Sequence, residues 1–198
     1  CDDGAKTIDR AKTIGTKKIN GIEIIISRAE LAKKRGIRTY NFDLNGVWNI
    51  PSNSFDVVTA TEVVEHLVNL DNFFDQIKRV LKKGGKLIIS TENLASPHNI
   101  FALLLGNQPF TGPYLSRKFS VGYQPVNCYR KSKERVLMPP HLNVMTKKAL
   151  IRLLELNGFK IVNIKGIAFY PFPPFLASIF SLLAGNYATY VVVEATKE

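Results

Sequence analysis

The stretch from Phe55 to Leu67 constrains the fold of this chain more than any other, because it joins a buried strand to an acidic helix start. Its first six residues read Phe-Asp-Val-Val-Thr-Ala, a short apolar run that is typical of a strand covered on both faces. Glu62 and Glu65 follow at once, where acidic side chains favour the N-terminal end of a helix. A strand that runs directly into a helix is expected within a sheet of the α/β class.

The alternation of strand and helix continues on both sides of this stretch. Strands are expected at residues 18–24, 38–42, 55–60, 86–91, 159–167 and 187–195. A first helix is expected at residues 5–13, and a second from a capping box at Ser27 and Glu30 to Gly36. A third helix is expected to bury Phe73, Phe74, Ile77, Val80 and Leu81 and to end at Gly84 and Gly85. A fourth is expected from Thr146 to Gly158. This spacing implies right-handed crossovers and a doubly wound, mostly parallel sheet with helices on both faces. Such sheets bind ligands at the carboxyl ends of their strands.

The composition is sufficient for one sizeable core. The chain has 198 residues, 45% of them hydrophobic, and no repeat or low-complexity tract, so a single domain over residues 1–198 is expected. The two cysteines, Cys1 and Cys128, cannot form a disulfide framework and show no metal-ligand spacing with the three histidines. We therefore expect no metal site and a reducing, cytoplasmic location.

The net charge of +11 requires either an anionic partner or many solvated surface lysines. Several basic residues fit the last turns of helices, where cations are favourable. A further basic cluster lies between residues 117 and 135, interleaved with aromatic residues and without regular periodicity. A solvated surface is one interpretation of this cluster. Binding of an anionic substrate, a phospholipid surface or a nucleic acid is the other.

Two segments interrupt the alternation. Residues 96–140 read as an irregular insertion, and insertions of this length in compact domains usually have a function. Residues 169–185 are apolar, but the uninterrupted run after Pro174 is only about half of the roughly 20 residues that a membrane helix needs. This apolar segment is expected to pack over the sheet edge, to form a homodimer contact, or to face lipid, although it lacks the basic polar face of interfacial helices.

Four landmarks follow one another in order along the chain. They are Gly21-Ile22-Glu23 at a strand end, Phe42-Asp43-Leu44 after the next strand, the stretch 55–67, and Leu81 to Gly85 before the strand at 86–91. With these landmarks the chain resembles the class I S-adenosylmethionine-dependent methyltransferases of the small-molecule type. The resemblance implies a Rossmann-like sheet of seven strands with the last one antiparallel. It also places the first strand and the start of the glycine loop before Cys1, with Asp2 where the loop usually has a glycine.

The resemblance assigns S-adenosylmethionine as the cofactor and S-adenosylhomocysteine as the product. The residues implied in cofactor binding are Gly4, Glu23, Ile24, Asp43, Leu44, Thr61, Glu62 and Val63. Glu23 would accept both ribose hydroxyls, because a carboxylate only accepts, and Asp43 would accept the adenine amino group. Leu44 would pack on the adenine ring, and residues 61–63 would line the methionine end. Without the resemblance, Glu23 is an ordinary strand-end carboxylate, Asp43 is a turn residue, and Glu62 and Glu65 are helix-start residues.

Methylation of an oxygen would use a general base, and histidine is the natural candidate. His66, His98 and His141 all follow strands on the expected ligand side, and the last two flank the insertion at 96–140. A solitary histidine is more often a packing or capping residue, and this alternative stays open for each of them.

Three functions are consistent with these features. The first is O- or C-methylation of a small-molecule or lipid-linked acceptor in a pocket shaped by residues 96–140 and 169–185, with a peripheral membrane contact left open. The second is RNA methylation, which the charge alone suggests, but no Asn-Pro-Pro-Tyr motif follows the strand expected at residues 55–60. The third is a non-catalytic binding or scaffold protein, suggested by Asp2 and the incomplete loop. A dinucleotide-binding protein would share the sheet and Glu23 but would not explain Asp43.

Overall fold

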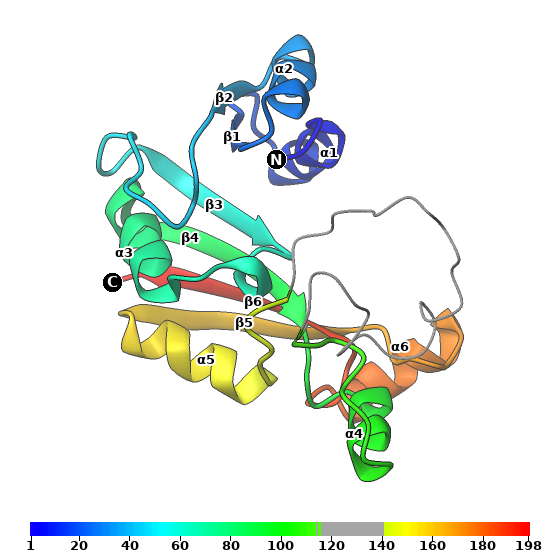
Figure 1. The fold of residues 1–198 in the computed structure, drawn as a ribbon. Helices are drawn as coiled ribbons and strands as arrows, with labels where there is room; N and C mark the ends of the chain where they lie inside the picture. The colour runs from blue at the N-terminus through cyan, green and yellow to red at the C-terminus, as the bar shows by residue number, and fades with distance from the viewer. Residues whose placement is uncertain (114, 116–140) are drawn as a thin grey trace. The chain divides into compact units, whose positions relative to one another are not determined.

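The computed structural model describes residues 1–113, 115 and 141–198 of the chain (Figure 1). These residues form two compact units, Cys1–Asn49 (unit 1) and Ile50–Glu198 (unit 2). Most of the expected insertion at 96–140, the basic cluster at 117–135 and Cys128 lie outside the described residues. The single domain expected over 1–198 stays a prediction.

Unit 1 contains two helices and a pair of short parallel strands. The elements are α1 (Ala5–Ile14), β1 (Asn20–Ile22), α2 (Ile26–Lys34) and β2 (Arg38–Tyr40), with Asn20 opposite Arg38 in the ladder. Its buried hydrophobic residues are Ala11, Ala29, Ala32, Ile37 and Trp48. The predicted alternation of helix and strand is confirmed here, although both strands are shorter than predicted.

The predicted capping box at Ser27 and Glu30 is wrong. Helix α2 begins at Ile26, so Ile25 occupies the N-cap position and offers no side-chain acceptor. The N–H of Ile25 is instead bound by the carboxylate of Glu23, at 3.0 Å from Oε1. A residue before the helix therefore supplies the acceptor that the capping box was expected to provide.

Unit 2 is built on a four-stranded sheet in the order β3-β4-β6-β5. The strands are β3 (Phe55–Thr61), β4 (Leu81–Glu92), β5 (Phe159–Ile167) and β6 (Tyr190–Lys197). Strand β3 pairs with β4 in parallel, whereas β6 runs antiparallel to both β4 and β5. The predicted Rossmann-like α/β fold with an antiparallel last strand is confirmed. Six strands occur in the part of the chain that the structure describes.

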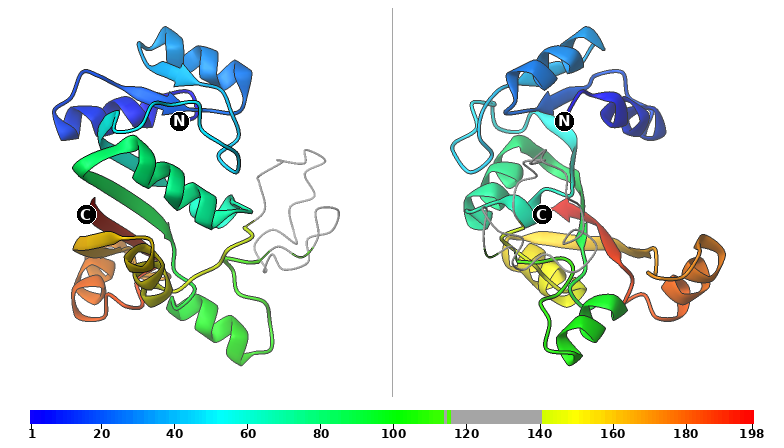
Figure 2. Two further views of the ribbon diagram at one scale, coloured as in Figure 1. Left: turned by 90° about the vertical axis from the view of Figure 1, so that its left-hand side faces the viewer. Right: turned by 45° about the vertical axis from the view of Figure 1, so that its right-hand side comes forward.

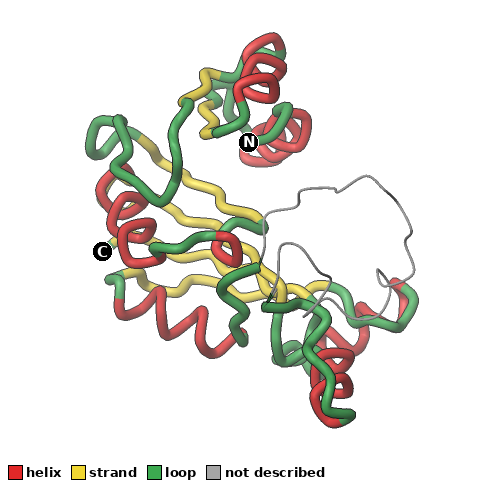
Figure 3. The backbone as a smooth tube through the Cα atoms, viewed as in Figure 1, coloured by secondary structure: helices red, strands yellow, loops and turns green. Residues whose placement is uncertain are grey.

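Some helices of unit 2 pack beside this sheet, and others lie in the connections beyond the ends of its strands (Figures 2 and 3). They are the short 3-10 helix η1 (Val64–His66), α3 (Leu70–Val80), α4 (Pro97–Leu104), α5 (Lys147–Leu156) and α6 (Pro174–Leu183). Helix α3 contacts β4, and α5 contacts β5. The fully buried side chains include Phe73, Phe74 and Ile77 of α3, Leu150 and Leu154 of α5, and Leu87, Ile89, Val191 and Val193 of the strands. No described helix has the length and apolar character needed to cross a membrane.

The predicted end of α3 at Gly84 and Gly85 is wrong. The helix ends at Val80 and β4 begins at Leu81, so both glycines lie inside the strand. They occupy a register shift, in which Phe55 and Val57 of β3 pair with Leu81 and Lys86. A Cβ on Gly85 would lie 2.8 Å from the Lys82 carbonyl oxygen, so a side chain would not fit in this irregular part of the strand.

Candidate cofactor and acceptor site

The loop before α1 requires glycine at position 4. Gly4 has φ 88°, and a Cβ there would lie 2.5 Å from Cδ1 of Ile37 and 3.2 Å from Ala32. The residue therefore allows α1 to start close to the rest of unit 1. Packing inside unit 1 explains Gly4 on its own, and its role in cofactor binding stays a prediction.

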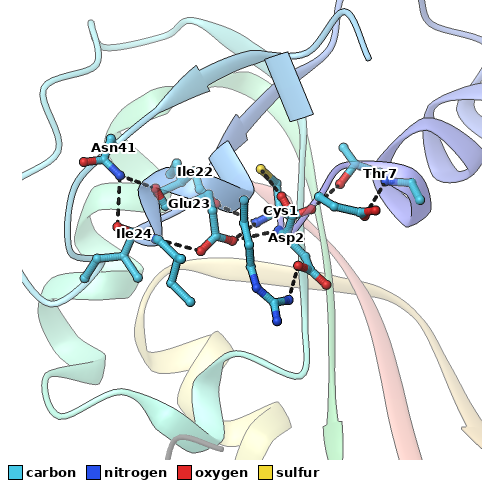
Figure 4. Close-up of polar contacts among 11 residues, drawn as sticks. Cys1, Asp2, Thr7, Ile22, Glu23, Ile24 and Asn41 are labelled. Carbon is cyan, nitrogen blue, oxygen red and sulfur yellow. Dashed lines mark hydrogen bonds and ion pairs between the residues drawn. The ribbon is translucent and has the colours of Figure 1, made fainter. Parts of the chain in front are cut away.

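Glu23 follows β1 and accepts several backbone hydrogen bonds (Figure 4). Its Oε2 accepts from the N–H of Asp2 at 2.7 Å, and its Oε1 accepts from the N–H of Ile25. Burial would raise the pKa of this carboxyl, but the two backbone donors lower it overall. Glu23 is therefore an ionised acceptor at neutral pH. Oε2 also accepts from the Cys1 amine at 3.3 Å, so Oε1 is the oxygen that keeps a lone-pair direction for a ligand hydroxyl.

Asp2 is turned away from Glu23 by an ion pair. Its side chain contacts the guanidinium of Arg28, and the hydrogen bond from Arg28 lowers the pKa of Asp2. Asp3 is held similarly, with Oδ2 at 2.9 Å from Nη2 of Arg35. Asp2 also has a positive φ of 52°, a backbone conformation that glycine adopts more easily. Asp2 thus adopts a backbone conformation that is more common for glycine, and its place in a cofactor loop stays a prediction.

Asp43 and Leu44 lie in a tight turn after β2. Asp43 Oδ1 accepts from the N–H and from the Nδ2 of Asn45, both at 2.9 Å. The Leu44 carbonyl accepts from Nε1 of Trp48 at 3.2 Å. Ile24 is exposed, and its carbonyl accepts from Asn41 at 3.0 Å. The turn function of Asp43 is present, and its exposed carboxylate is also available to a ligand.

Thr61, Glu62 and Val63 lie at the carboxyl end of β3, as expected. Glu62 has φ 51°, and its N–H donates to the Ser90 carbonyl at 3.1 Å. Its Oε1 accepts from the hydroxyl of Ser90 at 2.9 Å. Burial raises the pKa of Glu62 to about 7, and the charge of Glu65 adds to this effect. Glu62 therefore changes its charge near physiological pH.

Glu65 and Glu92 extend this group of carboxyls. The side chain of Glu65 is only 3% exposed, and its Oε2 accepts from the hydroxyl of Thr91 at 3.1 Å. Burial raises the pKa of Glu65. Glu92 ends β4, and its buried Oε2 accepts no hydrogen bond from the described residues. Tyr190 of β6 lies near the same charges, since burial and then Glu92, Glu62 and Glu65 raise its pKa.

The structure brings His66 and His141 together beside these carboxyls. Their ring centroids are 4.8 Å apart. His141 Nδ1 lies 2.8 Å from the Thr111 carbonyl and 3.2 Å from Oε2 of Glu92. The shorter contact places the proton of neutral His141 on Nδ1 and leaves Nε2 as the acceptor nitrogen. Burial lowers the pKa of His141, but Glu92 and the Thr111 carbonyl raise it overall.

Hydrogen bonds to the backbone of η1 and Leu67 hold His141 beside His66, although the two residues are far apart in the sequence. The N–H groups of Leu142 and Asn143 both donate to the carbonyl of Glu65, at 2.6 and 3.1 Å. The side-chain amide of Asn143 donates to the carbonyls of Val64 and Leu67. These bonds fix the segment that begins at His141 against η1. We call Glu62, Glu65, Glu92, His66 and His141 the acid–imidazole cluster.

Part of this cluster could hold a metal ion. Glu65, His66 and His141 each offer a ligand atom, and these atoms lie within 4.8 Å of one another. Carboxylate and imidazole donors suit divalent cations such as Zn²⁺ or Mn²⁺. The sequence predicted no metal, and that prediction remains untested.

His98 lies apart from the other two histidines. It is in the first turn of α4, with its ring at 5.4 Å from that of Phe110 and 5.2 Å from that of Tyr170. Burial lowers its pKa, so His98 is neutral at physiological pH. Its surroundings are those of a packed aromatic histidine rather than of a charged site.

Sequence reasoning missed Glu92 and Thr111, and it assigned Glu65 a structural role. The sequence could have identified Glu92 as a candidate site residue, because it is an acidic residue directly after a predicted strand, as Glu23 and Asp43 are. Thr111 acts through its backbone carbonyl, which no side-chain pattern can indicate.

Comparisons with known proteins agree with this fold. Residues 1–164 match the family described as "Methyltransferase domain". The mitochondrial ubiquinone biosynthesis O-methyltransferase of Dictyostelium discoideum is 27% identical over 160 residues, which cover 77% of this chain and 43% of that protein. The chain thus spans less than half the length of the first curated relatives it matches.

Solved structures show the same fold at low sequence identity. An S-adenosylmethionine-dependent methyltransferase from Methanosarcina mazei has a TM-score of 0.63 at 15% identity, covering 100% of this chain and 89% of its own. Geranyl diphosphate C-methyltransferase from Streptomyces coelicolor, in complex with Mg²⁺, geranyl diphosphate and S-adenosylhomocysteine, has a TM-score of 0.58 at 13% identity, covering 100% and 71%. The chain belongs to the methyltransferase domain family, and its fold is that of the S-adenosylmethionine-dependent methyltransferases.

Proposed function

We propose that this chain carries out S-adenosylmethionine-dependent O-methylation of a small, apolar acceptor. The observation that carries the proposal is the acid–imidazole cluster at the carboxyl ends of β3 and β4, in which Oε2 of Glu92 lies 3.2 Å from Nδ1 of His141. A carboxylate that contacts an imidazole in this way suits the imidazole to act as a general base toward an acceptor hydroxyl. The printed name of the Dictyostelium relative, a ubiquinone biosynthesis O-methyltransferase, supports oxygen as the methylated atom and an apolar acceptor.

The residues of unit 1 fit the cofactor. Glu23 is ionised and keeps a lone pair on Oε1 for a ribose hydroxyl, and the exposed carboxylate of Asp43 can accept from the adenine amino group. S-adenosylmethionine, when bound, supplies an activated methyl group. The protein therefore has to orient the acceptor and manage its proton.

His141 is the base that this geometry favours. Its Nε2 is the acceptor nitrogen, and Glu92 stabilises the imidazolium that forms when this nitrogen takes the hydroxyl proton. With S-adenosylmethionine bound, the electron pair left on the oxygen would form the bond to the methyl carbon as the carbon–sulfur bond breaks, and S-adenosylhomocysteine would be the leaving group. Glu62, with a pKa of about 7, can receive a proton from the same cluster at neutral pH. His98, which has a lowered pKa and aromatic neighbours, is not needed as a base.

A calorimetric titration with S-adenosylmethionine and S-adenosylhomocysteine tests the cofactor part of the proposal. We expect micromolar binding that is lost in Glu23→Ala and in Asp43→Ala. Unchanged binding in both variants would contradict the assigned cofactor residues. No heat from a folded sample would contradict cofactor binding altogether and favour a non-catalytic role.

Product formation tests the acceptor part. Release of S-adenosylhomocysteine is measured with alkyl-substituted phenols, with the matching anilines and with total RNA. We expect turnover with the phenols only, and a decrease in kcat of about 10²-fold or more in His141→Gln with unchanged cofactor affinity. The matched control is His98→Gln, which should retain kcat within a few-fold. Turnover on RNA alone would replace the proposal by RNA methylation.

A further inference from the structure

Helix α6 carries an exposed apolar stripe. Phe175, Ile179 and Leu183 are spaced four residues apart, so they lie along one side of the helix. Their exposed fractions are 69%, 52% and 77%. Large apolar side chains exposed in a continuous row mark a binding surface in a folded protein.

The remainder of α6 is fixed to unit 2. Ala177 is buried, and the ring of Phe180 lies 5.4 Å from Phe169 and 4.8 Å from Phe172. Phe169 is itself buried at the end of the segment that follows β5. The apolar stripe therefore belongs to a packed helix and is presented outward in a fixed direction.

A cationic pocket adjoins this stripe. It has a volume of about 770 Å³, and its lining residues are Lys147, Ile164, Lys165, Gly166, Ile167, Ala168, Ser178, Leu183, Ala184, Gly185, Asn186 and Tyr187. Leu183 belongs both to the pocket wall and to the exposed stripe. The pocket and the stripe therefore form one continuous surface.

The charge of this surface is positive. None of the pocket's lining residues is acidic, and α6 contains no charged residue at all. Among the described residues, lysine ion pairs are formed by Lys12, Lys33, Lys82 and Lys86, so Lys147 and Lys165 are not neutralised in this way. Two ammonium groups next to an apolar row match a partner with anionic groups above an apolar layer.

We propose that α6 and its adjoining pocket dock on an anionic phospholipid surface. Lys147 and Lys165 contact headgroup phosphates, while Phe175, Ile179 and Leu183 enter the acyl boundary. The sequence of residues 169–185 lacks the basic face of an interfacial helix, and the fold supplies these charges from α5 and β5 instead. This inference goes beyond the proposed methylation, because lipid binding requires neither cofactor nor acceptor.

Flotation of the whole chain with lipid vesicles tests the proposal. The probes are vesicles of phosphatidylcholine alone and of phosphatidylcholine mixed with phosphatidylglycerol, without S-adenosylmethionine. We expect binding to the anionic vesicles only. The double variant Lys147→Gln/Lys165→Gln should bind them about 25-fold more weakly, from about fivefold for each cation lost near the membrane. Phe175→Ser/Ile179→Ser should weaken binding at least about tenfold.

Matched variants control for general effects. Lys160→Gln removes an exposed lysine of β5 outside the pocket, and Leu156→Ser removes an exposed leucine of α5 outside the stripe. Both should bind like the unmodified chain, with circular dichroism confirming that every variant is folded. Absent vesicle binding, or equal losses in test and control variants, would overturn the proposal. So would a dimer in light scattering that Phe175→Ser/Ile179→Ser dissociates, because a second copy would then cover the stripe. Either result leaves the methylation assays unaffected.

Discussion

Replacement of Glu62 by glutamine should make the protein more stable and less able to bind its cofactor. The Glu62 carboxyl is half-buried near Glu65, and its pKa is raised from 4.5 to about 7. A folded-state pKa above the unfolded value means that folding disfavours the charged form. The resulting penalty is absent well below pH 4.5, grows as the pH rises, and is complete above pH 7. Glutamine removes the charge and keeps an acceptor oxygen for the Ser90 hydroxyl.

The expected change in the free energy of unfolding follows from the raised pKa of Glu62. A difference of about 2.5 units corresponds to about 3.4 kcal/mol at about 1.36 kcal/mol per unit. Glu62 is partly accessible to solvent, so screening reduces the expected penalty to about half of that value. Glu62→Gln should therefore raise the free energy of unfolding by about 1.5 kcal/mol at pH 8 and by about 0.5 kcal/mol or less at pH 5.

Urea denaturation followed by circular dichroism at pH 5 and pH 8 measures this difference. The matched control is Glu155→Gln, since Glu155 lies on the exposed side of α5 with its carboxylate 3.5 Å from Arg152. Its effect should stay within about 0.5 kcal/mol at both pH values. A Glu62→Gln variant that is less stable than the unmodified chain at pH 8 would refute the reasoning. Increased stability together with weaker S-adenosylmethionine binding would indicate that Glu62 is retained for its ligand.

Three further outcomes are expected. Asn143→Ala removes the amide that donates to the Leu67 carbonyl and one of the two donors to the Val64 carbonyl, so the free energy of unfolding should fall by about 1–3 kcal/mol in urea denaturation; an unchanged value would mean that water replaces the amide. Gly4→Ala should cost more than Gly15→Ala in thermal melts, because both have a positive φ but only position 4 brings a Cβ to 2.5 Å from Ile37; equal costs would contradict the packing argument. Glu92→Gln should lower the pKa of His141 in an NMR titration of the imidazole signals, and an unshifted signal would show that Glu92 does not act on it.

The order of the elements could be predicted from the sequence because it rests on local patterns. Helix α5 starts at its predicted cap, where the Thr146 hydroxyl accepts from the N–H of Ala149 at 3.3 Å, and β5 occupies the predicted residues 159–167. Errors occurred where a distant contact decides the structure. Gly84 and Gly85 resemble a helix end, but they fill a register shift against β3. Ser27 resembles a cap, but the acceptor comes from Glu23 before the helix.

The candidate site could be predicted only in part for the same reason. The residues at strand ends, such as Glu23 and Glu62, were identified because the strands themselves are recognisable. The pairing of His141 with His66 depends on backbone hydrogen bonds from Leu142 and Asn143 to Glu65, which join segments far apart in the sequence. No pattern within either segment indicates that contact.

Several unfavourable features of unit 2 lie at or just after the ends of β3 and β4. Glu62 combines a positive φ with a half-buried carboxyl, Glu65 is buried with a raised pKa, and the buried Oε2 of Glu92 has only the ion-pair contact with His141 among the described residues. Each feature lowers stability, and hydrophobic residues at these positions would avoid the cost. Elsewhere in the described part of this sheet, the buried side chains are predominantly apolar, as in Leu87 and Val193. Unfavourable charges confined to one edge are expected where a ligand compensates for them, so the acid–imidazole cluster is better explained by binding and proton transfer than by folding.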